Sequence, residues 1–341
     1  RPLADNAVRG TLAGGLAVPE LEELVYTENV AAPKYKVKKT PEAVTVTLPA
    51  MSVKFDKATG ALSFFDANGG LLLQESARSI AESSIDGVPC YDVSESFVSP
   101  EDEHLYGTGQ FQDGFLDIRG LSRRLTQVNT QISLPYVISS KGYALQWNGY
   151  GLTEFNPCSE CTGLSRIDAE AGSQTVNATG TSGNRREMRW FSDFEGELSI
   201  TESGRYALLL DMGQSMSRRQ FLQIDDDVVI DCSNTWLPPT TSTIVELEAG
   251  THRLYATGVK GDAPRLYTRR IDNTTTFHSP VATALDYTVY AGSADECIAS
   301  YRRLTGEVPH MQDWMFGYIH CRERYSSSDD ILENAAGFRQ R

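Results

Sequence analysis

Apolar and polar residues alternate along much of the chain. The alternation is clear at 44–48, 53–55 and 62–64. A period of two is typical of strands that bury one face. Because the same pattern returns at 142–147 and 286–291, most of the chain is predicted to form a β-sandwich.

A second set of strand patterns interrupts this sandwich. Its clearest runs lie at 204–210, 221–224 and 252–256. Each run is rich in Leu, Val, Ile or Tyr and is separated from the next by turn residues, which is typical of strands. We therefore expect an inserted second β-sandwich.

Composition marks the limits of this insert. Residues 169–183 are rich in Ala, Gly, Ser and Thr, and a run of Thr at 274–276 closes the other side. Such segments are typical of linkers or turns. The expected domains are an N-terminal β-sandwich at 1–160 and 275–292, the insert at 165–274, and a C-terminal segment at 293–341.

The pattern changes to a helical one after Gly292. Ser293 precedes acidic residues, as at the start of a helix, and Gly306 suits its end. Between them, apolar residues recur at helical spacing: Cys297, Ile298, Tyr301 and Leu304. A linker helix is predicted here.

A further unit follows this helix. An apolar run at 315–319 predicts a strand over 315–321, and Ser326–Ser328 is suited to capping a second amphipathic helix. Strand followed by helix is the repeating unit of a (β/α)8 barrel. The sequence is therefore expected to end within the first of eight such units. The predicted fold class is mainly β, with a β-sandwich, an inserted β-sandwich and the first β/α unit of an incomplete barrel.

Composition narrows the class of protein. The chain has 341 residues, of which 40% are hydrophobic and 22% charged, so two or three globular domains are expected. A net charge of −14 argues against nucleic acid as a partner, because nucleic-acid binding depends on clustered Lys and Arg. The longest apolar runs are too short to cross a bilayer, so membrane insertion is not expected.

Two stretches resemble glycoside hydrolase family 31. The first is Leu-Tyr-Gly-Thr-Gly-Gln at 105–110, followed by Gln-Val-Asn-Thr-Gln-Ile-Ser-Leu-Pro-Tyr at 127–136. It is similar to the family's N-terminal sandwich, of galactose-mutarotase type, although Thr108 and Gln110 replace the commonest Leu and Glu. The second is Tyr-Arg-Arg-Leu-Thr-Gly at 301–306 with the residues up to 325, which resembles the family's entry into its catalytic barrel.

The insert carries its own resemblance. Gly-Glu-Leu at 196–198, Glu-Ser-Gly-Arg-Tyr at 202–206 and Leu-Glu-Ala-Gly-Thr-His at 247–252 are similar to the β-sandwich first described in anthrax protective antigen. Inserts of this kind occur in family 31 α-xylosidases that act on xyloglucan oligosaccharides. The resemblance therefore implies an oligosaccharide substrate and favours α-xylosidase over α-glucosidase.

The resemblance also implies where catalysis lies. Retaining glycosidases use two carboxyl groups, and this family supplies them from later barrel strands. The family's nucleophile motif is Trp-x-Asp-Met-x-Glu, whereas the similar string at 190–195 has its Asp one residue too far along. No catalytic residue is assigned, and the chain alone is predicted to be inactive. A stand-alone carbohydrate-binding protein is the competing hypothesis, but such a protein has no need of residues 301–341.

Polar residues after the first motif are the best candidates for sugar binding. They are Gln127, Asn129, Thr130 and Gln131, and their amides and hydroxyl suit hydrogen bonds to sugar hydroxyls. By resemblance, their loop walls the subsite of the sugar that is cleaved off. The alternative is a solvated hairpin whose amides cap its own backbone.

Other candidates have equally plain alternatives. Arg322 and Glu323 follow the expected barrel strand, where active sites form, but an Arg–Glu pair can also be structural. Trp236 could stack on a sugar or anchor a loop. Asp225–Asp227 could ligate Ca²⁺, although an acidic hairpin turn explains these residues more simply. Cys158 and Cys161 are free thiols, a local disulfide or part of a metal site.

The sequence predicts no metal and no cofactor. One Cys-x-x-Cys without a second pair or a nearby His lacks the four ligands of a structural zinc site. The family resemblance implies a periplasmic or secreted polysaccharide-degrading protein.

Overall fold

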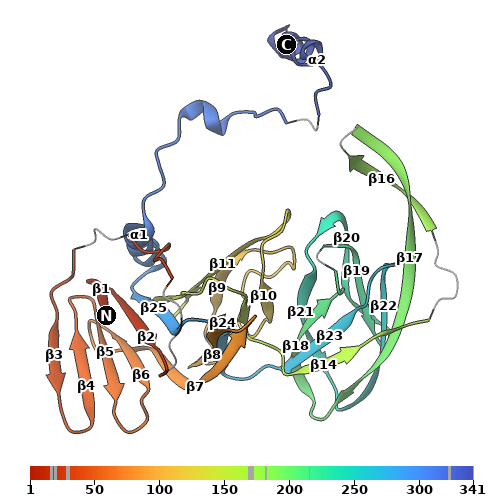
Figure 1. Cartoon of the computed structure of the whole chain (residues 1–341). Coiled ribbons are helices and arrows are strands. Elements are labelled where there is room, and N and C mark those ends of the chain that lie inside the picture. The colour runs from red at the N-terminus through yellow and green to blue at the C-terminus, as the bar shows by residue number, and fades with distance from the viewer. Residues whose placement is uncertain are drawn as a thin grey trace.

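The computed structural model describes residues 1–15, 18, 21–27, 31–167, 173–180, 183–214, 216–321 and 324–340. These residues form two antiparallel β-sandwiches side by side, followed by a C-terminal segment that leads away from both (Figure 1). The fold is mainly β, as predicted.

The first sandwich consists of a smaller and a larger sheet. The smaller sheet has the strand order β1 (Pro2–Ala4), β2 (Ala7–Leu12), β25 (Leu285–Ala291), β12 (Tyr143–Trp147), β11 (Ile132–Ser139), β9 (Leu105–Gln110). The larger has the order β10 (Arg123–Leu125), β13 (Thr153–Phe155), β24 (Thr274–Ala282), β8 (Val88–Val98), β7 (Leu71–Ile85), β6 (Leu62–Asp66), β5 (Met51–Asp56), β4 (Ala43–Thr47), β3 (Lys36–Lys39).

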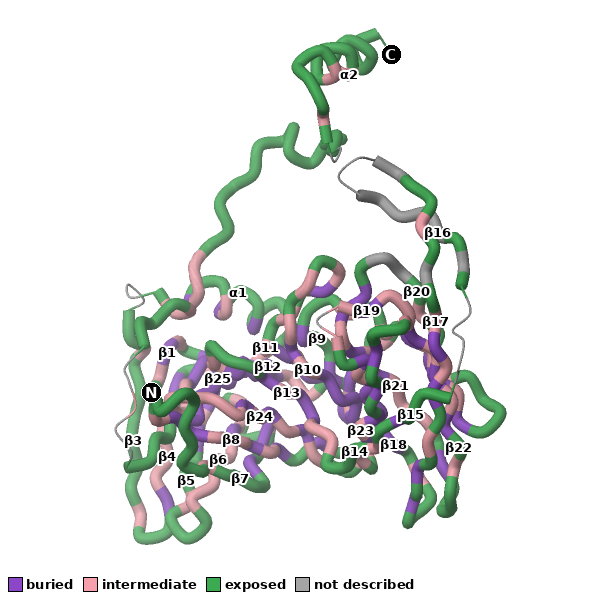
Figure 2. Tube along the Cα trace, turned by 45° about the vertical axis from the view of Figure 1, so that its right-hand side comes forward, coloured by how far each residue is buried: buried purple, intermediate pink, exposed green. Residues whose placement is uncertain are grey.

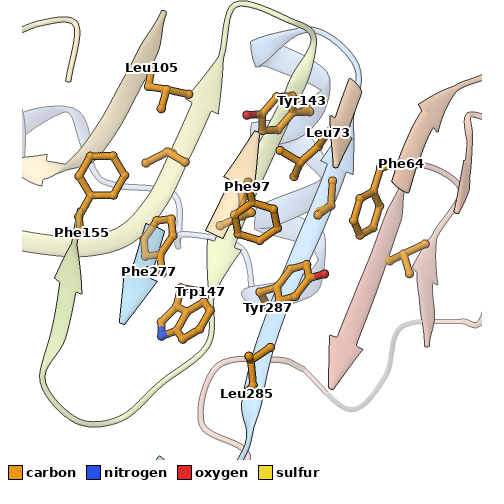
Figure 3. Packing of buried hydrophobic residues seen from close by; sticks show 14 of the residues in the cluster. Phe64, Leu73, Phe97, Leu105, Tyr143, Trp147, Phe155, Phe277, Leu285 and Tyr287 are labelled. Carbon is orange, nitrogen blue, oxygen red and sulfur yellow. The ribbon is translucent and has the colours of Figure 1, made fainter. Parts of the chain in front are cut away.

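Aromatic residues fill the space between these sheets (Figure 3). The ring of Trp147 stacks on that of Phe277 at 5.7 Å, and Tyr287 meets Phe97 edge to face at 5.3 Å. All four are almost fully buried. The alternating residues seen in the sequence supply this core, because every second side chain of a strand points to the same face.

The second sandwich is the insert. One sheet has the order β14 (Glu160–Gly163), β23 (Arg265–Arg270), β18 (Gly204–Asp211), β21 (Thr240–Leu247). The other has the order β15 (Ser165–Arg166), β17 (Gly183–Ile200), β22 (Gly250–Val259), β19 (Ser217–Ile224), β20 (Asp227–Leu237), and β16 (Ser173–Gly180) pairs with β17. A separate cluster of buried residues, Leu208, Leu222 and Leu254 among them, forms its core.

The predicted linker helix is present as α1 (Ala294–Thr305). Ser293 and Glu296 form a capping box at its start, and Gly306 follows its last residue with φ 103°. Cys297 and Leu304 are buried against the outer face of the smaller sheet, while Ile298 is exposed. The helical spacing therefore predicted the element correctly but overestimated the width of its buried stripe.

One predicted linker proves to be a strand in part. Residues 173–180 form β16, which pairs with β17 from Ser173↔Trp190 to Gly180↔Gly183. This hairpin projects from the insert (Figure 1). The backbone N–H and C=O groups of this segment form hydrogen bonds with β17. A composition typical of linkers therefore did not prevent a strand.

The predicted barrel strand at 315–321 is not formed. Asp313–Phe316 is a 3₁₀ helix, and 317–321 has no regular structure. A strand needs a hydrogen-bonded neighbour, and no neighbour pairs with this stretch, all of which is described. The predicted second helix is present as α2 (Ser328–Gln340), and it and most of residues 307–321 are exposed (Figure 2).

Candidate functional site

The predicted sugar-binding residues lie in the loop that connects β10 to β11, here called the 126–131 loop. Val128 and Gln131 exchange two backbone hydrogen bonds of 3.2 Å, which close the loop. The amide of Gln131 is buried and donates to the carbonyl of Thr126 at 2.7 Å. Gln131 therefore caps the loop's own backbone, as the alternative interpretation proposed.

The other loop residues differ in exposure. Gln127 and Asn129 are exposed, and Gln127 accepts a weak hydrogen bond of 3.4 Å from the backbone of Ser133. The hydroxyl of Thr130 instead donates to the backbone carbonyl of Trp236 in the insert. Thr130 thus joins the two sandwiches, while Gln127 and Asn129 face solvent beside it.

Trp236 is the insert's contribution to this surface. Its side chain is 38% exposed, and the guanidinium of Arg218 lies 4.8 Å from its ring centre. It is therefore not the fully buried loop anchor of the alternative interpretation. The structure brings Trp236 and the 126–131 loop together, although they come from different sandwiches and are more than 100 residues apart in sequence.

The strand beneath the loop requires its glycines. Gly107 and Gly109 have φ of 133° and 105°, and Thr108 between them has φ 62°. A Cβ on Gly109 would lie 2.1 Å from the carbonyl oxygen of Ile132, and one on Gly107 would lie 2.4 Å from that of Tyr136. The Gly-Thr-Gly sequence therefore lets β9 approach β11 closely at the base of the loop.

A buried ion pair supports the same region. Arg123 binds Asp113 through two hydrogen bonds of 2.8 and 2.7 Å, and a third of 2.6 Å reaches the hydroxyl of Thr108. The two charged side chains are 3% and 4% exposed, and the ring of Phe111 lies 4.3 Å from the guanidinium. Burial lowers the pKa of Arg123. The pair ties β9 and the following loop to β10, where the 126–131 loop begins.

Sequence reasoning missed this pair. The two residues are ten positions apart in a stretch without clear periodicity. The one available signal was the presence of an Asp and an Arg between the two parts of the first motif, 105–110 and 127–136.

The rest of the junction between the sandwiches is closed. Ser242 of the insert donates to the carbonyl of Ser122 in the first sandwich, and within the insert Gln220 donates to the carbonyl of Pro238 at 2.7 Å. The cavity between the sandwiches has a volume of about 10 Å³, room for no more than one water molecule. This cavity is therefore too small for a sugar, whereas the exposed residues of the loop and Trp236 are accessible to one.

A ladder of charged side chains crosses between the sandwiches. The two ring nitrogens of His278 lie 2.9 Å from a carboxylate oxygen of Glu154 and 3.1 Å from one of Asp92. Arg124 lies 3.6 Å from Glu154 and 2.6 Å from Asp211 of the insert. The hydrogen bond with Glu154 raises the pKa of His278, and the same bond lowers that of Glu154. We call this group the charge ladder. No local pattern predicted it, because its members lie on strands far apart in sequence.

The other residues predicted from the sequence to bind sugar or calcium are Arg322, Glu323 and Asp225–Asp227. Arg322 and Glu323 lie outside the described residues. Asp225 lies in a turn with φ 53°, and its carboxylate accepts from the ring of His252 at 2.7 Å and from the backbone of Arg253 at 2.8 Å. These contacts match the acidic-turn interpretation.

The cysteines form no disulfide in this structure, and the described residues form no metal site. All six cysteines are free thiols, and burial raises the pKa of Cys158 to about 11, so this thiol is a poor nucleophile. Among the residues that the structure describes, no three His, Cys, Asp or Glu side chains are grouped to hold a metal ion.

Several known proteins resemble the chain in sequence. No protein-family model matches. The chain is 24% identical over 349 residues to an α-xylosidase of Saccharolobus solfataricus, a match that covers 99% of this chain and 32% of that protein. It is 34% identical over 118 residues to an uncharacterized family 31 glucosidase of Pseudescherichia vulneris, covering 28% of this chain and 22% of that protein.

Solved structures of family 31 α-xylosidases resemble the chain in fold. The family 31 α-xylosidase of Xanthomonas citri superposes with a TM-score of 0.78 at 24% identity, covering 99% of this chain and 41% of that one. A family 31 α-xylosidase from a soil metagenome, complexed with xylose, superposes with a TM-score of 0.58 at 20% identity, covering 99% and 36%. The chain therefore shares the fold of part of each of these two family 31 α-xylosidases.

The chain covers only part of the proteins that it resembles. It spans about a third of the length of the S. solfataricus relative. Within the described part of the chain, no helix is both long and apolar enough to span a membrane.

Proposed function

We propose that the chain forms the substrate-shaping part of a retaining α-glycosidase that removes α-linked xylose from xyloglucan-type oligosaccharides. The similarity to enzymes named α-xylosidases supports the choice of reaction. In this proposal the insert is a separate module, and the whole protein works in the periplasm or outside the cell.

One observation carries the proposal, namely the contact of Thr130 with Trp236. It joins the loop that carries the exposed amides of Gln127 and Asn129 to the segment that carries the partly exposed indole of Trp236. Amides bind sugar hydroxyls, and an aromatic ring packs against the apolar face of a pyranose, so this surface has the chemistry that an oligosaccharide requires. Thr130 itself acts by holding the loop against the insert.

The C-terminal segment belongs to the same proposal. Its exposed apolar residues include Trp314, Phe316, Tyr318, Leu332 and Phe338. Such a cluster marks a surface that another part of a protein covers. We assign it to a catalytic barrel that supplies the two carboxyl groups of the retaining mechanism, about 5 Å apart. The chain by itself is then unable to hydrolyse a glycoside.

The substrate is tested on the full-length protein with p-nitrophenyl α-xyloside and p-nitrophenyl α-glucoside. A higher kcat/KM for the xyloside supports the proposal. A preference for the glucoside would establish α-glucosidase instead, which the similarity to a protein named a family 31 glucosidase favours. No hydrolysis of either, with oligosaccharide binding retained, would favour a carbohydrate-binding protein. Hydrolysis by residues 1–341 alone would contradict the proposed division of labour.

The junction is tested by Trp236→Ala and Thr130→Val in the full-length protein. Both are expected to raise KM for a xyloglucan oligosaccharide more than for the p-nitrophenyl xyloside, because the longer substrate reaches further from the cleaved bond. Thr47→Val makes the same chemical change at an exposed position of β4 in the first sandwich and serves as the control. Unchanged kcat and KM in both junction variants would exclude a role of this surface in substrate binding.

A further inference from the structure

A second cavity lies apart from the junction, in the first sandwich. Its volume is about 330 Å³, at the lower end of the range for small-molecule pockets, roughly 300–1,000 Å³. Three connections form it: the β7–β8 turn, the loop after β12 and the β24–β25 turn, together with Leu21 and Glu23 from the N-terminal region. None of the residues of the 126–131 loop or of the insert lines it.

Charged residues form one wall of this cavity. The guanidinium of Arg9 binds Asp286 at 2.8 Å and Glu23 at 2.8 Å. Arg9 and Asp286 are largely buried, with side-chain exposures of 16% and 10%, whereas Glu23 is 34% exposed. Because Arg9 is already shared between two carboxylates, an anionic ligand would be repelled. Carboxylate oxygens with unused lone pairs can instead accept hydrogen bonds from a neutral ligand.

Asn148 adds an acceptor that needs a donor. Its side-chain nitrogen donates to Asp286 at 3.2 Å, and its backbone N–H donates to the carbonyl of Asp286 at 2.9 Å. Its side-chain oxygen is buried and finds no hydrogen-bond partner among the described residues. A buried acceptor without a partner is costly, so a donor such as a hydroxyl group is favoured at this position.

The rim of the cavity is apolar and aromatic. Tyr150 is 44% exposed, and its hydroxyl is fixed by donating to Glu23 at 3.0 Å and accepting from the backbone of Leu24 at 3.1 Å. Three exposed aliphatic residues complete the rim: Leu21, Ile85 and Val88. An exposed ring with a fixed orientation is suited to packing on the C–H face of a sugar.

We propose that this cavity binds one neutral pyranose unit, separately from the junction and from catalysis. Hydroxyl groups would donate to Asn148, Glu23 and Asp286, and the ring of Tyr150 would cover an apolar face of the sugar. The size, the surplus of acceptors and the aromatic rim each agree with this class of ligand. The site would hold an oligosaccharide or polysaccharide near the protein rather than take part in bond cleavage.

The test uses the 341-residue chain and methyl α-D-xylopyranoside, titrated by ligand-observed NMR. A dissociation constant on the order of 1–10 mM is expected, because a single sugar unit offers few contacts. Asn148→Ala, Tyr150→Ala and Val88→Trp, which fills the rim, are each expected to weaken binding about tenfold, the effect of losing one good contact. Tyr35→Ala replaces a tyrosine that is 52% exposed and does not line the cavity, so it is the matched control and should bind as the unchanged chain does.

Several outcomes would overturn the proposal. These are no binding at tens of millimolar, binding that persists in Tyr150→Ala and Val88→Trp, and binding that Tyr35→Ala abolishes. Displacement of the sugar by methylammonium at equal concentration would show an amine site instead. Tyr150 and Val88 are exposed, so their variants decide the matter even where Asn148→Ala does not fold. The test measures binding to the 341-residue chain and not hydrolysis by the full-length enzyme. A failure of this proposal is therefore distinguishable from a failure of the proposed function.

Discussion

The helices α1 and α2 begin with similar local signals and have different surroundings. In α1, the Ser293 hydroxyl caps the helix and Leu304 is buried under the smaller sheet. In α2, the hydroxyl of Ser327 accepts from the backbone of Asp330 at 3.2 Å, but no residue of the helix is buried. Both helices thus have a local cap, but only the packed helix α1 is linked to the stability of the whole protein. The same contrast separates the body, residues 1–305, from the tail, residues 307–340.

The largest expected difference concerns buried charge. Asp113→Ala leaves Arg123 buried without its partner, so the free energy of unfolding of the body should fall by about 3–5 kcal/mol. Asp313→Ala, in the exposed tail, should leave it unchanged. Urea denaturation of both variants measures this. Equal effects would mean that the tail is packed as firmly as the body.

Apolar burial should separate the two helices nearly as strongly. Leu304→Ala removes a side chain that is 2% exposed and should cost about 2–5 kcal/mol of unfolding free energy. Leu332→Ala removes one that is 66% exposed in this chain and should cost almost nothing. Thermal melts followed at the body's near-UV signal provide the comparison. A large loss from Leu332→Ala would show that α2 packs on the body in solution.

Capping should have a smaller effect of the same kind. Ser293→Ala breaks the capping box of α1, and we expect a loss of about 0.5–2 kcal/mol in global stability. Ser327→Ala should lower only the helicity of α2 and leave the global transition in place, because α2 unfolds without the body. Hydrogen exchange of the two helices, measured alongside urea titrations, distinguishes these results. Identical exchange protection of α1 and α2 would contradict the comparison.

The smallest expected effect is the pH dependence of the charge ladder. Because the folded-state pKa of His278 is raised, its contribution to stability is complete below its unfolded pKa of about 6.5 and is lost as pH rises through the folded pKa. His278→Gln should therefore lower the melting temperature at pH 5.5 more than at pH 8.5.

His320→Gln, in the exposed tail, is the control and should show no such dependence. A pH-independent difference between His278→Gln and the unchanged chain would mean that protonation of His278 does not contribute to stability.

Much of the fold was readable from the sequence because the relevant forces are local. Alternation of apolar residues predicted the strands that carry Trp147 and Tyr287, and the Ser293 cap predicted α1. The candidate site was predictable only in part. Asn129 and Gln127 are exposed as a sugar-binding role requires, but Gln131 is used within its own loop.

The rest was decided by tertiary structure. Residues 173–180 became a strand because a partner was available, while 315–321 did not because none was. The Arg123–Asp113 pair, the contact of Thr130 with Trp236 and the cavity beside Asn148 all join residues distant in sequence. Sequence periodicity shows which face of a strand or helix is apolar, because side chains on one face recur at a fixed spacing along the chain. Which side chains meet depends on how the sheets are packed together, and no local pattern records that.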